Sequence, residues 1–231
     1  MPRFLPAGDA ALTVELGNRI AVPLNRKVRV LALALEKAAL PGVIEVVPTY
    51  RSLTIYYDPL SLSLGALRRQ VEELLERLED IPLPPPRLVT IPTVYGGEYG
   101  PDLPFVAQHC GLTEEAVIRL HTRPTYHVYM LGFTAGYAYL GGMPKRLSAP
   151  RLPSPRLRVP AGSVGIGGNQ TGMYPVESPG GWRLIGRTPL TLFDPGWEVP
   201  VLIRPGDQVK FVCITPDEFT AHLGRTRSVP A

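Results

Sequence analysis

The sequence predicts an α+β protein, with a ferredoxin-like α/β domain over residues 1–85 followed by a β-rich domain over residues 86–231. In the first eighty residues, apolar stretches of strand period alternate with two stretches of helical period. Three consecutive prolines, residues 84–86, then hold an extended segment, which we take as the boundary. After residue 124, short alternating stretches separated by proline and glycine are typical of a β-barrel or sandwich.

The N-terminal domain is expected to run strand, helix, strand, strand, helix, strand. The expected elements are strand 12–16, helix 26–40, strand 43–47, strand 53–57, helix 64–78 and strand 88–94. Asn25 is expected to cap the first helix. This order is the split βαβ, or ferredoxin-like, arrangement, in which two helices cover one face of an antiparallel sheet. The last strand follows the prolines, so it fits either domain.

The second domain is expected to begin with two short helices and to continue in strands. Asp102 is placed to cap a helix through residue 108, and Thr113 to cap another through His121. Near the negative end of that helix, we interpret His121 as a cation. The expected strands are 126–130, 156–159, 163–166, 182–185, 190–193, 201–203 and 208–214.

Composition and missing motifs exclude several classes of function. The net charge of +4 is spread along the chain, so no nucleic-acid partner is expected. The N-terminus lacks the pattern of a signal peptide and the longest apolar run is too short to cross a bilayer, so we expect a cytoplasmic protein without a membrane partner. The four histidines lack zinc-ligand spacing, so no metal is expected. Neither a phosphate-binding P-loop nor a G-x-S-x-G serine motif is present.

Two glycine-rich segments are the candidates for a binding site. The first, residues 132–142, carries Tyr137 and Tyr139, and the second, residues 156–175, carries Gln170 and Thr171. Backbone amides and polar side chains in such segments can hold a carboxylate, an amide or a phosphate. The alternative is that these glycines only form tight turns between barrel strands.

Several strings in the chain resemble one protein family. They are residues 8–12, 95–102, 136–142, 158–166, 170–175, 178–182 and 186–189. These strings are similar to the family of 5-oxoprolinase B subunits, also named allophanate hydrolase subunit 1 or kinase-inhibitor-like proteins. That family is related to the C and D subdomains of the biotin-dependent carboxyltransferases in urea carboxylase. Ala135 and Tyr137 depart from it, since we expect Pro and Phe at these positions.

The resemblance implies a fold and an activity. The implied fold is a ferredoxin-like domain followed by a cyclophilin-like β-barrel, and the implied activity is the ATP-dependent opening of 5-oxo-L-proline to L-glutamate. The implied partners are a larger carboxyltransferase-like subunit and a third, lactam-utilisation-type subunit. ATP is implied for the complex. Its use is chemically reasonable, because resonance protects a lactam carbonyl and phosphorylation of the amide oxygen would remove that protection.

The family-like strings also suggest substrate-binding residues, which we expect to line one pocket. They are Tyr139, Gln170, Thr171, Tyr174 and Arg187. Gln170 and Thr171 would bind the lactam or its carboxylate, and Arg187 would face an anion. Alternatives are a regulatory module that inhibits a sensor histidine kinase and a subunit acting on another small amide such as allophanate. Prolyl isomerase activity would rest on fold alone, which does not determine function.

Overall fold

The computed structural model describes residues 2–223. The chain divides into two compact units, Met1–Pro85 and Pro86–Ala231, each of which has its own hydrophobic core. Over the described residues, every helix is too short or too polar to cross a membrane.

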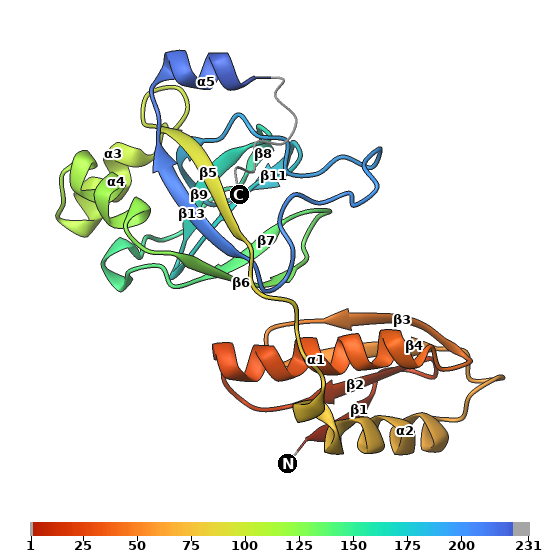
Figure 1. The fold of residues 1–231 in the computed structure, drawn as a ribbon. Helices are drawn as coiled ribbons and strands as arrows, with labels where there is room; N and C mark the ends of the chain where they lie inside the picture. The colour runs from red at the N-terminus through yellow and green to blue at the C-terminus, as the bar shows by residue number, and fades with distance from the viewer. Residues whose placement is uncertain (1, 224–231) are drawn as a thin grey trace. The chain divides into compact units, whose positions relative to one another are not determined.

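The first unit is an antiparallel sheet covered on one face by two helices (Figure 1). The strand order is β1 (Arg3–Pro6), β2 (Ala11–Glu15), β4 (Ser52–Tyr57) and β3 (Val43–Pro48). The helices are α1 (Val22–Ala38) and α2 (Leu64–Glu76), and a short 3-10 turn, η1 (Leu78–Asp80), follows α2. The register places Leu12 beside Ile55 and Val14 beside Leu53. These four buried side chains share one face of the sheet, and both helices pack on it.

The strand order departs from the ferredoxin-like prediction. That prediction requires a strand after α2, for which residues 88–94 are the candidate. In the structure this segment is β5 (Leu88–Tyr95) of the second unit, and the corresponding sheet edge is formed by β1, which pairs with β2. The ferredoxin-like order is therefore not confirmed. β1 carries little signal in the sequence, because this strand has four residues, ends in proline and is mostly exposed.

Asn25 does not cap α1. The helix begins earlier, at Val22, with Pro23 in its first turn, where proline is well tolerated because its missing N–H has no helical acceptor there. Asn25 therefore lies inside the helix and is fully buried. Its side-chain amide donates hydrogen bonds to the carbonyl oxygens of Thr49 and Tyr50, and so ties α1 to the turn between β3 and β4.

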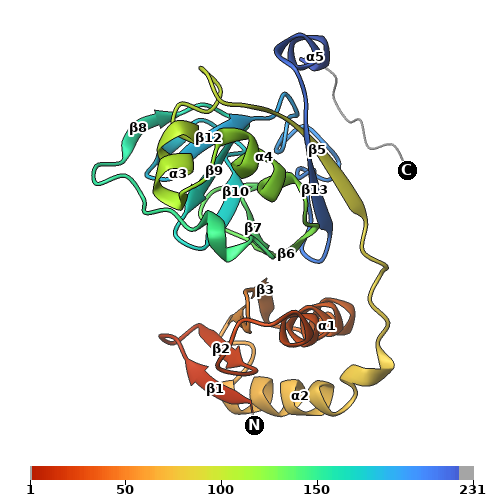
Figure 2. The same ribbon diagram turned by 90° about the vertical axis from the view of Figure 1, so that its left-hand side faces the viewer.

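The second unit is built around a seven-stranded, barrel-like sheet (Figure 2). Its order is β10 (Gln170–Met173), β9 (Ser163–Gly167), β12 (Arg183–Arg187), β5, β13 (Gln208–Cys213), β6 (Tyr126–Leu131) and β7 (Ala138–Gly141). The edge strands β10 and β7 lie against each other, which nearly closes the sheet. A separate two-stranded ribbon pairs β8 (Arg156–Val159) with β11 (Ser178–Gly180), and η2 (Lys145–Leu147) follows β7. The helices are α3 (Leu103–Cys110), α4 (Glu114–Thr122) and α5 (Pro216–His222).

The glycine-rich segments contain strands. β7 lies inside the first segment, and β8, β9 and β10 lie inside the second. Residues 190–193 and 201–203, in contrast, form no strand, and only an isolated bridge joins Phe193 to Val201. The predicted cap of α4 is confirmed, since the Thr113 side chain accepts a hydrogen bond from the backbone N–H of Ala116.

Asp102 stands at the start of α3, but its carboxylate does not cap the helix. It accepts a hydrogen bond of 2.7 Å from the backbone N–H of Leu184 and binds Arg156 at 2.9 Å. Arg183 approaches it at 3.9 Å. The carboxylate, 10% exposed, therefore joins α3, β12 and β8 through one buried charge.

Replacing Asp102 by Ala should lower the free energy of unfolding of the second unit by about 3 kcal/mol, because the Leu184 N–H and Arg156 lose their acceptor and Arg183 loses a nearby opposite charge. Both tryptophans, Trp182 and Trp197, lie in this unit, so their fluorescence during urea unfolding reports on it. Glu177→Ala is the matched control. It removes the exposed partner of Arg158 and should cost less than about 1 kcal/mol. Equal losses in the two variants would contradict the role given to Asp102.

Candidate ligand-binding pocket

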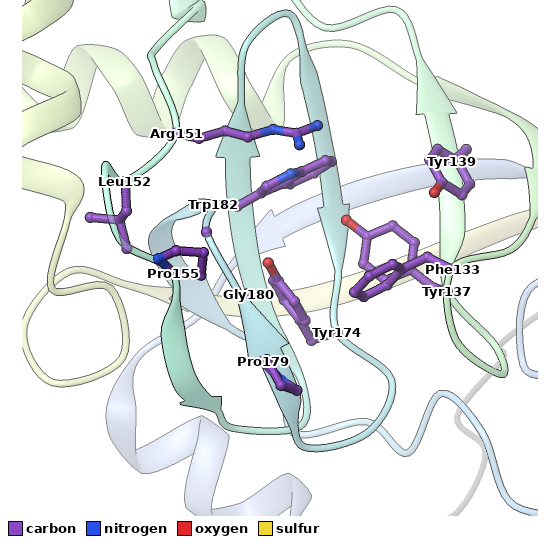
Figure 3. Close-up of a pocket in the computed structure, with 11 residues that line it drawn as sticks. Phe133, Tyr137, Tyr139, Arg151, Leu152, Pro155, Tyr174, Pro179, Gly180 and Trp182 are labelled. Atoms are coloured by element: carbon purple, nitrogen blue, oxygen red, sulfur yellow. The ribbon is translucent and has the colours of Figure 1, made fainter.

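A pocket of about 560 Å³ lies on the outer face of the barrel-like sheet (Figure 3). Its size is within the range of about 300–1,000 Å³ common for small-molecule sites. The strand alternation explains its position. Ala138 and Leu140 of β7 point into the barrel core, whereas Tyr139 of β7 and Tyr137, the residue just before this strand, line the pocket.

The same alternation leaves the outer face of β9 without side chains at two positions. Val164 and Ile166 fill the barrel core, and Gly165 and Gly167 alternate with them. A Cβ atom at Gly167 would lie 2.6 Å from the Trp182 ring, which is closer than atoms pack. These glycines are therefore not turn residues. They leave room for the Trp182 side chain to pack directly on the strand backbone.

Two further glycines seat the tyrosines of the pocket. A Cβ at Gly172 on β10 would lie 3.0 Å from the Tyr137 hydroxyl. A Cβ at Gly180 on β11 would lie 2.7 Å from ring carbon Cε1 of Tyr174. The rings of the pocket thus lie directly on backbone, which restricts the room in which they can move.

Four aromatic rings form the floor of the pocket, and Tyr137 lies among the other three. Its ring meets Tyr139, Tyr174 and Trp182 edge to face, with centroid distances of 5.4, 5.7 and 5.9 Å. Such contacts are the preferred geometry of aromatic pairs and add stability beyond simple burial. The floor is therefore preorganised rather than assembled by a ligand.

Phe133 forms part of the pocket rim. It is 67% exposed and its φ of 64° lies in the left-handed region that costs a bulky residue about 1–2 kcal/mol. Its ring makes an edge-to-face contact with Tyr137 at 5.5 Å. An exposed, strained aromatic side chain beside a pocket is typical of a functional surface.

Burial raises the pKa of the Tyr174 phenol, and this effect outweighs the opposing effects of the Trp182 backbone N–H and of the guanidinium groups of Arg151 and Arg156. Tyr174 therefore keeps its proton at neutral pH. It brings no negative charge to the pocket.

Arg151 supplies the positive charge of the pocket. Its guanidinium carbon lies 6.0 Å from the centre of the Trp182 ring (Figure 3), within reach of a cation–π interaction. Among the described residues that line the pocket, Arg151 is the charged one. Sequence reasoning missed it, because it stands alone in an irregular segment.

The structure brings together two of the five predicted site residues. Tyr139 and Tyr174 line the pocket, whereas Gln170, Thr171 and Arg187 do not. Gln170 begins β10, where it pairs with Gly167. Arg187 donates its Nε–H to the carbonyl oxygen of Ala161 at 2.8 Å, so it is held by backbone rather than facing the pocket.

Thr171 lies in the barrel interior, where it completes a buried chain of hydrogen bonds. Its hydroxyl donates to the Gly165 carbonyl oxygen at 2.9 Å, so it must accept from Nε2–H of His121, 2.8 Å away. His121 Nδ1 then accepts from the Tyr95 hydroxyl, also at 2.8 Å. These bonds specify a neutral histidine with its proton on Nε2.

The prediction that His121 is a cation was wrong. The residue is fully buried, and this burial lowers its pKa to about 3. The helix end would favour a charge, but that effect is worth at most about 2 kcal/mol and is smaller than the cost of burying an unpaired imidazolium. Within residues 2–223, no group of three or more His, Cys, Asp and Glu side chains is placed to hold a metal ion.

Because the folded protein disfavours protonated His121, its contribution to stability is present above pH 6.5, the ordinary histidine value, and is lost as the pH falls towards 3. In urea unfolding between pH 7.5 and 5, the second unit should lose up to about 1.4 kcal/mol per pH unit below 6.5 from this residue. His121→Gln should lack this part of the slope. The exposed His109, changed to Gln, should retain it. A His121→Gln variant with the wild-type slope would contradict the assignment.

Comparison with known proteins relates the chain to one family. A family model described as carboxyltransferase domain, subdomain C and D, matches residues 2–203. The chain is 45% identical over 225 residues to the 5-oxoprolinase B subunit of Bacillus subtilis (strain 168), covering 93% of this chain and 94% of that one. It is 47% identical over 206 residues to the 5-oxoprolinase B subunit of Escherichia coli O157:H7, covering 89% and 93%.

A solved structure shows the same fold. The crystal structure of TTHA0988 is 40% identical with a TM-score of 0.78, and the match covers 100% of this chain. The chain spans 42% of the length of TTHA0988. The family-model match and the two identities above 40% over nearly the whole length show that this chain belongs to the carboxyltransferase subdomain C and D family, together with the 5-oxoprolinase B subunits.

Proposed function

We propose that this chain is the B-type subunit of an ATP-dependent 5-oxoprolinase that opens 5-oxo-L-proline to L-glutamate. The observation that carries the proposal is the identity of 45% and 47%, over nearly the full length of both chains, to two 5-oxoprolinase B subunits. The aromatic pocket is the site at which this chain contacts the lactam.

A subunit implies partners. We assign these as a larger carboxyltransferase-like subunit and a third, lactam-utilisation-type subunit. The length of TTHA0988 supports an association of this kind, since the region similar to this chain is 42% of a longer polypeptide. The cytoplasmic location expected from the sequence stays a prediction.

The chemistry of the pocket suits a small lactam. A lactam amide is planar, and flat aromatic rings such as those of the pocket floor pack well against a ring of this kind. The Tyr174 phenol, which burial keeps protonated, can donate a hydrogen bond to a carbonyl oxygen as negative charge develops there. In this proposal the chain holds and orients the ring and shields it from water.

The pocket does not fit ATP. A triphosphate needs several cations or a cradle of backbone N–H groups, whereas Arg151 is the charged group among the described lining residues. We therefore assign ATP binding to the partner subunits.

The proposal is tested by mixing the purified chain with the two partner subunits and measuring ATP-dependent release of glutamate from 5-oxo-L-proline. Omission of this chain should reduce the rate to the background level, because the lactam site would be incomplete. Allophanate serves as the alternative substrate. Glutamate release at the full rate without this chain would reject the proposal. So would a complex that turns over allophanate but not 5-oxo-L-proline.

The role of the pocket is tested by a matched pair of glycine variants. Gly180→Ala places a methyl group against the Tyr174 ring, whereas a Cβ at Gly65, in α2 of the first unit, has its nearest atom, Nη1 of Arg69, 3.9 Å away. A misplacement of about 1 Å in a site can lower a rate on the order of 100-fold, so Gly180→Ala should lose most activity in the assembled complex. Gly65→Ala should lose little, because Gly65 does not line the pocket. Size-exclusion chromatography checks that both variants form the complex to the same extent. If they do and their activities are equal, the lactam binds elsewhere.

A further inference from the structure

We propose that the pocket is specific for a small cyclic acid, with the ring on the aromatic floor and the single carboxylate bound to Arg151. That the acid is 5-oxo-L-proline rests on the proposed function. The class of ligand rests on the geometry and charge of the pocket.

The other arginines near the pocket are already engaged. Arg156 and Arg183 approach the Asp102 carboxylate at 2.9 and 3.9 Å, and the Arg183 guanidinium also stacks on Phe105, 3.6 Å from the ring centre. Arg151 differs from them, because no ion pair joins it to an acidic side chain in the described part of the chain. Its charge is therefore available to a ligand.

Trp182 positions this charge without neutralising it. A cation over an indole face is attracted by the ring, but the guanidinium N–H groups keep their capacity to donate. A guanidinium matches a carboxylate with two parallel hydrogen bonds. Arg151 thus lies beside one wall of the pocket with donors that a carboxylate can accept.

The other lining residues favour a ligand that carries one negative charge over a ligand that carries two. The described lining residues include no Asp or Glu, and burial keeps the Tyr174 phenol uncharged. No negative side chain of the described lining therefore competes for Arg151. Conversely, a ligand with two separated carboxylates would leave one of them against aromatic rings, where an unpaired charge is costly.

The inference is tested with the full-length chain and three probes, measured by ligand-detected NMR titration. The probes are 5-oxo-L-proline, its primary amide 5-oxo-L-prolinamide, and 2-pyrrolidinone, which lacks the carboxyl group. The wild-type chain should bind the acid roughly 10- to 100-fold more tightly than the amide, as expected for hydrogen bonds to a charged group. Arg151→Gln should remove this preference and leave the affinity for the amide unchanged.

Two further variants separate charge, geometry and general damage. Arg151→Lys should restore part of the preference, because a point charge remains without the paired donors. Arg187→Gln is the matched control, since Arg187 is held by the Ala161 carbonyl oxygen, and it should keep the wild-type preference. A preference that survives in Arg151→Gln, or that is lost in Arg187→Gln instead, would overturn the proposal. So would the failure of all three probes to bind the wild-type chain at millimolar concentration.

The assembled complex distinguishes this inference from the proposed function. In an active complex, Arg151→Gln should raise KM for 5-oxo-L-proline by about the factor by which the wild-type chain prefers the acid over the amide. The change in kcat should be smaller. Full activity with unchanged KM would reject the role of Arg151 and leave the proposed function standing. The opposite result is also possible: the wild-type complex releases no glutamate, but the chain still binds the acid more tightly through Arg151. That result would reject the proposed function and leave the inference standing.

Discussion

The pocket depends on the alternation of core residues and glycines along β9. Val164 and Ile166 hold the strand in the barrel core, and the glycine that follows each of them leaves the outer face open to Trp182. Any side chain at Gly167 would displace the indole, and with it the wall on which the guanidinium of Arg151 rests. Backbone exposed by glycine is therefore the physical origin of a concave aromatic surface on an otherwise ordinary strand.

The division of charge around the pocket follows from a second constraint, the position of Asp102. Its buried carboxylate binds Arg156, approaches Arg183 and accepts from the Leu184 backbone, so two of the arginines around the pocket have a structural partner. Arg151 has no such acid beside it among the described residues, and its neighbour is the Trp182 ring. One carboxylate thus both fixes α3 and the ribbon to the barrel and decides which guanidinium remains for a ligand.

Much of the architecture is predictable from hydrophobic alternation. The elements that the sequence does not predict are missed for identifiable physical reasons. The strands at 126–130, 156–159, 163–166 and 208–214 are predicted and present. β7 and β10 are not predicted, because glycine ordinarily signals a turn, whereas here it marks contact with aromatic rings. Among site residues, Tyr139 and Tyr174 are predicted and line the pocket. Arg151 escapes prediction, since a single arginine in an irregular segment carries no periodicity and acquires its role only from the contact with Trp182.

Thr171 shows why a residue in the right segment can have a different role. Side chains alternate between the two faces of a strand, so Thr171 and Gly172, neighbours in β10, point in opposite directions. Gly172 lies against the Tyr137 hydroxyl on the outer face, whereas Thr171 binds His121 in the core. The hydrogen bonds from Tyr95 through His121 to Thr171 fix β10 to β5 and α4, because they join side chains of these three elements and His121 and Thr171 are fully buried. The aromatic floor is therefore held in place from behind, by polar bonds on the face of β10 that no ligand reaches.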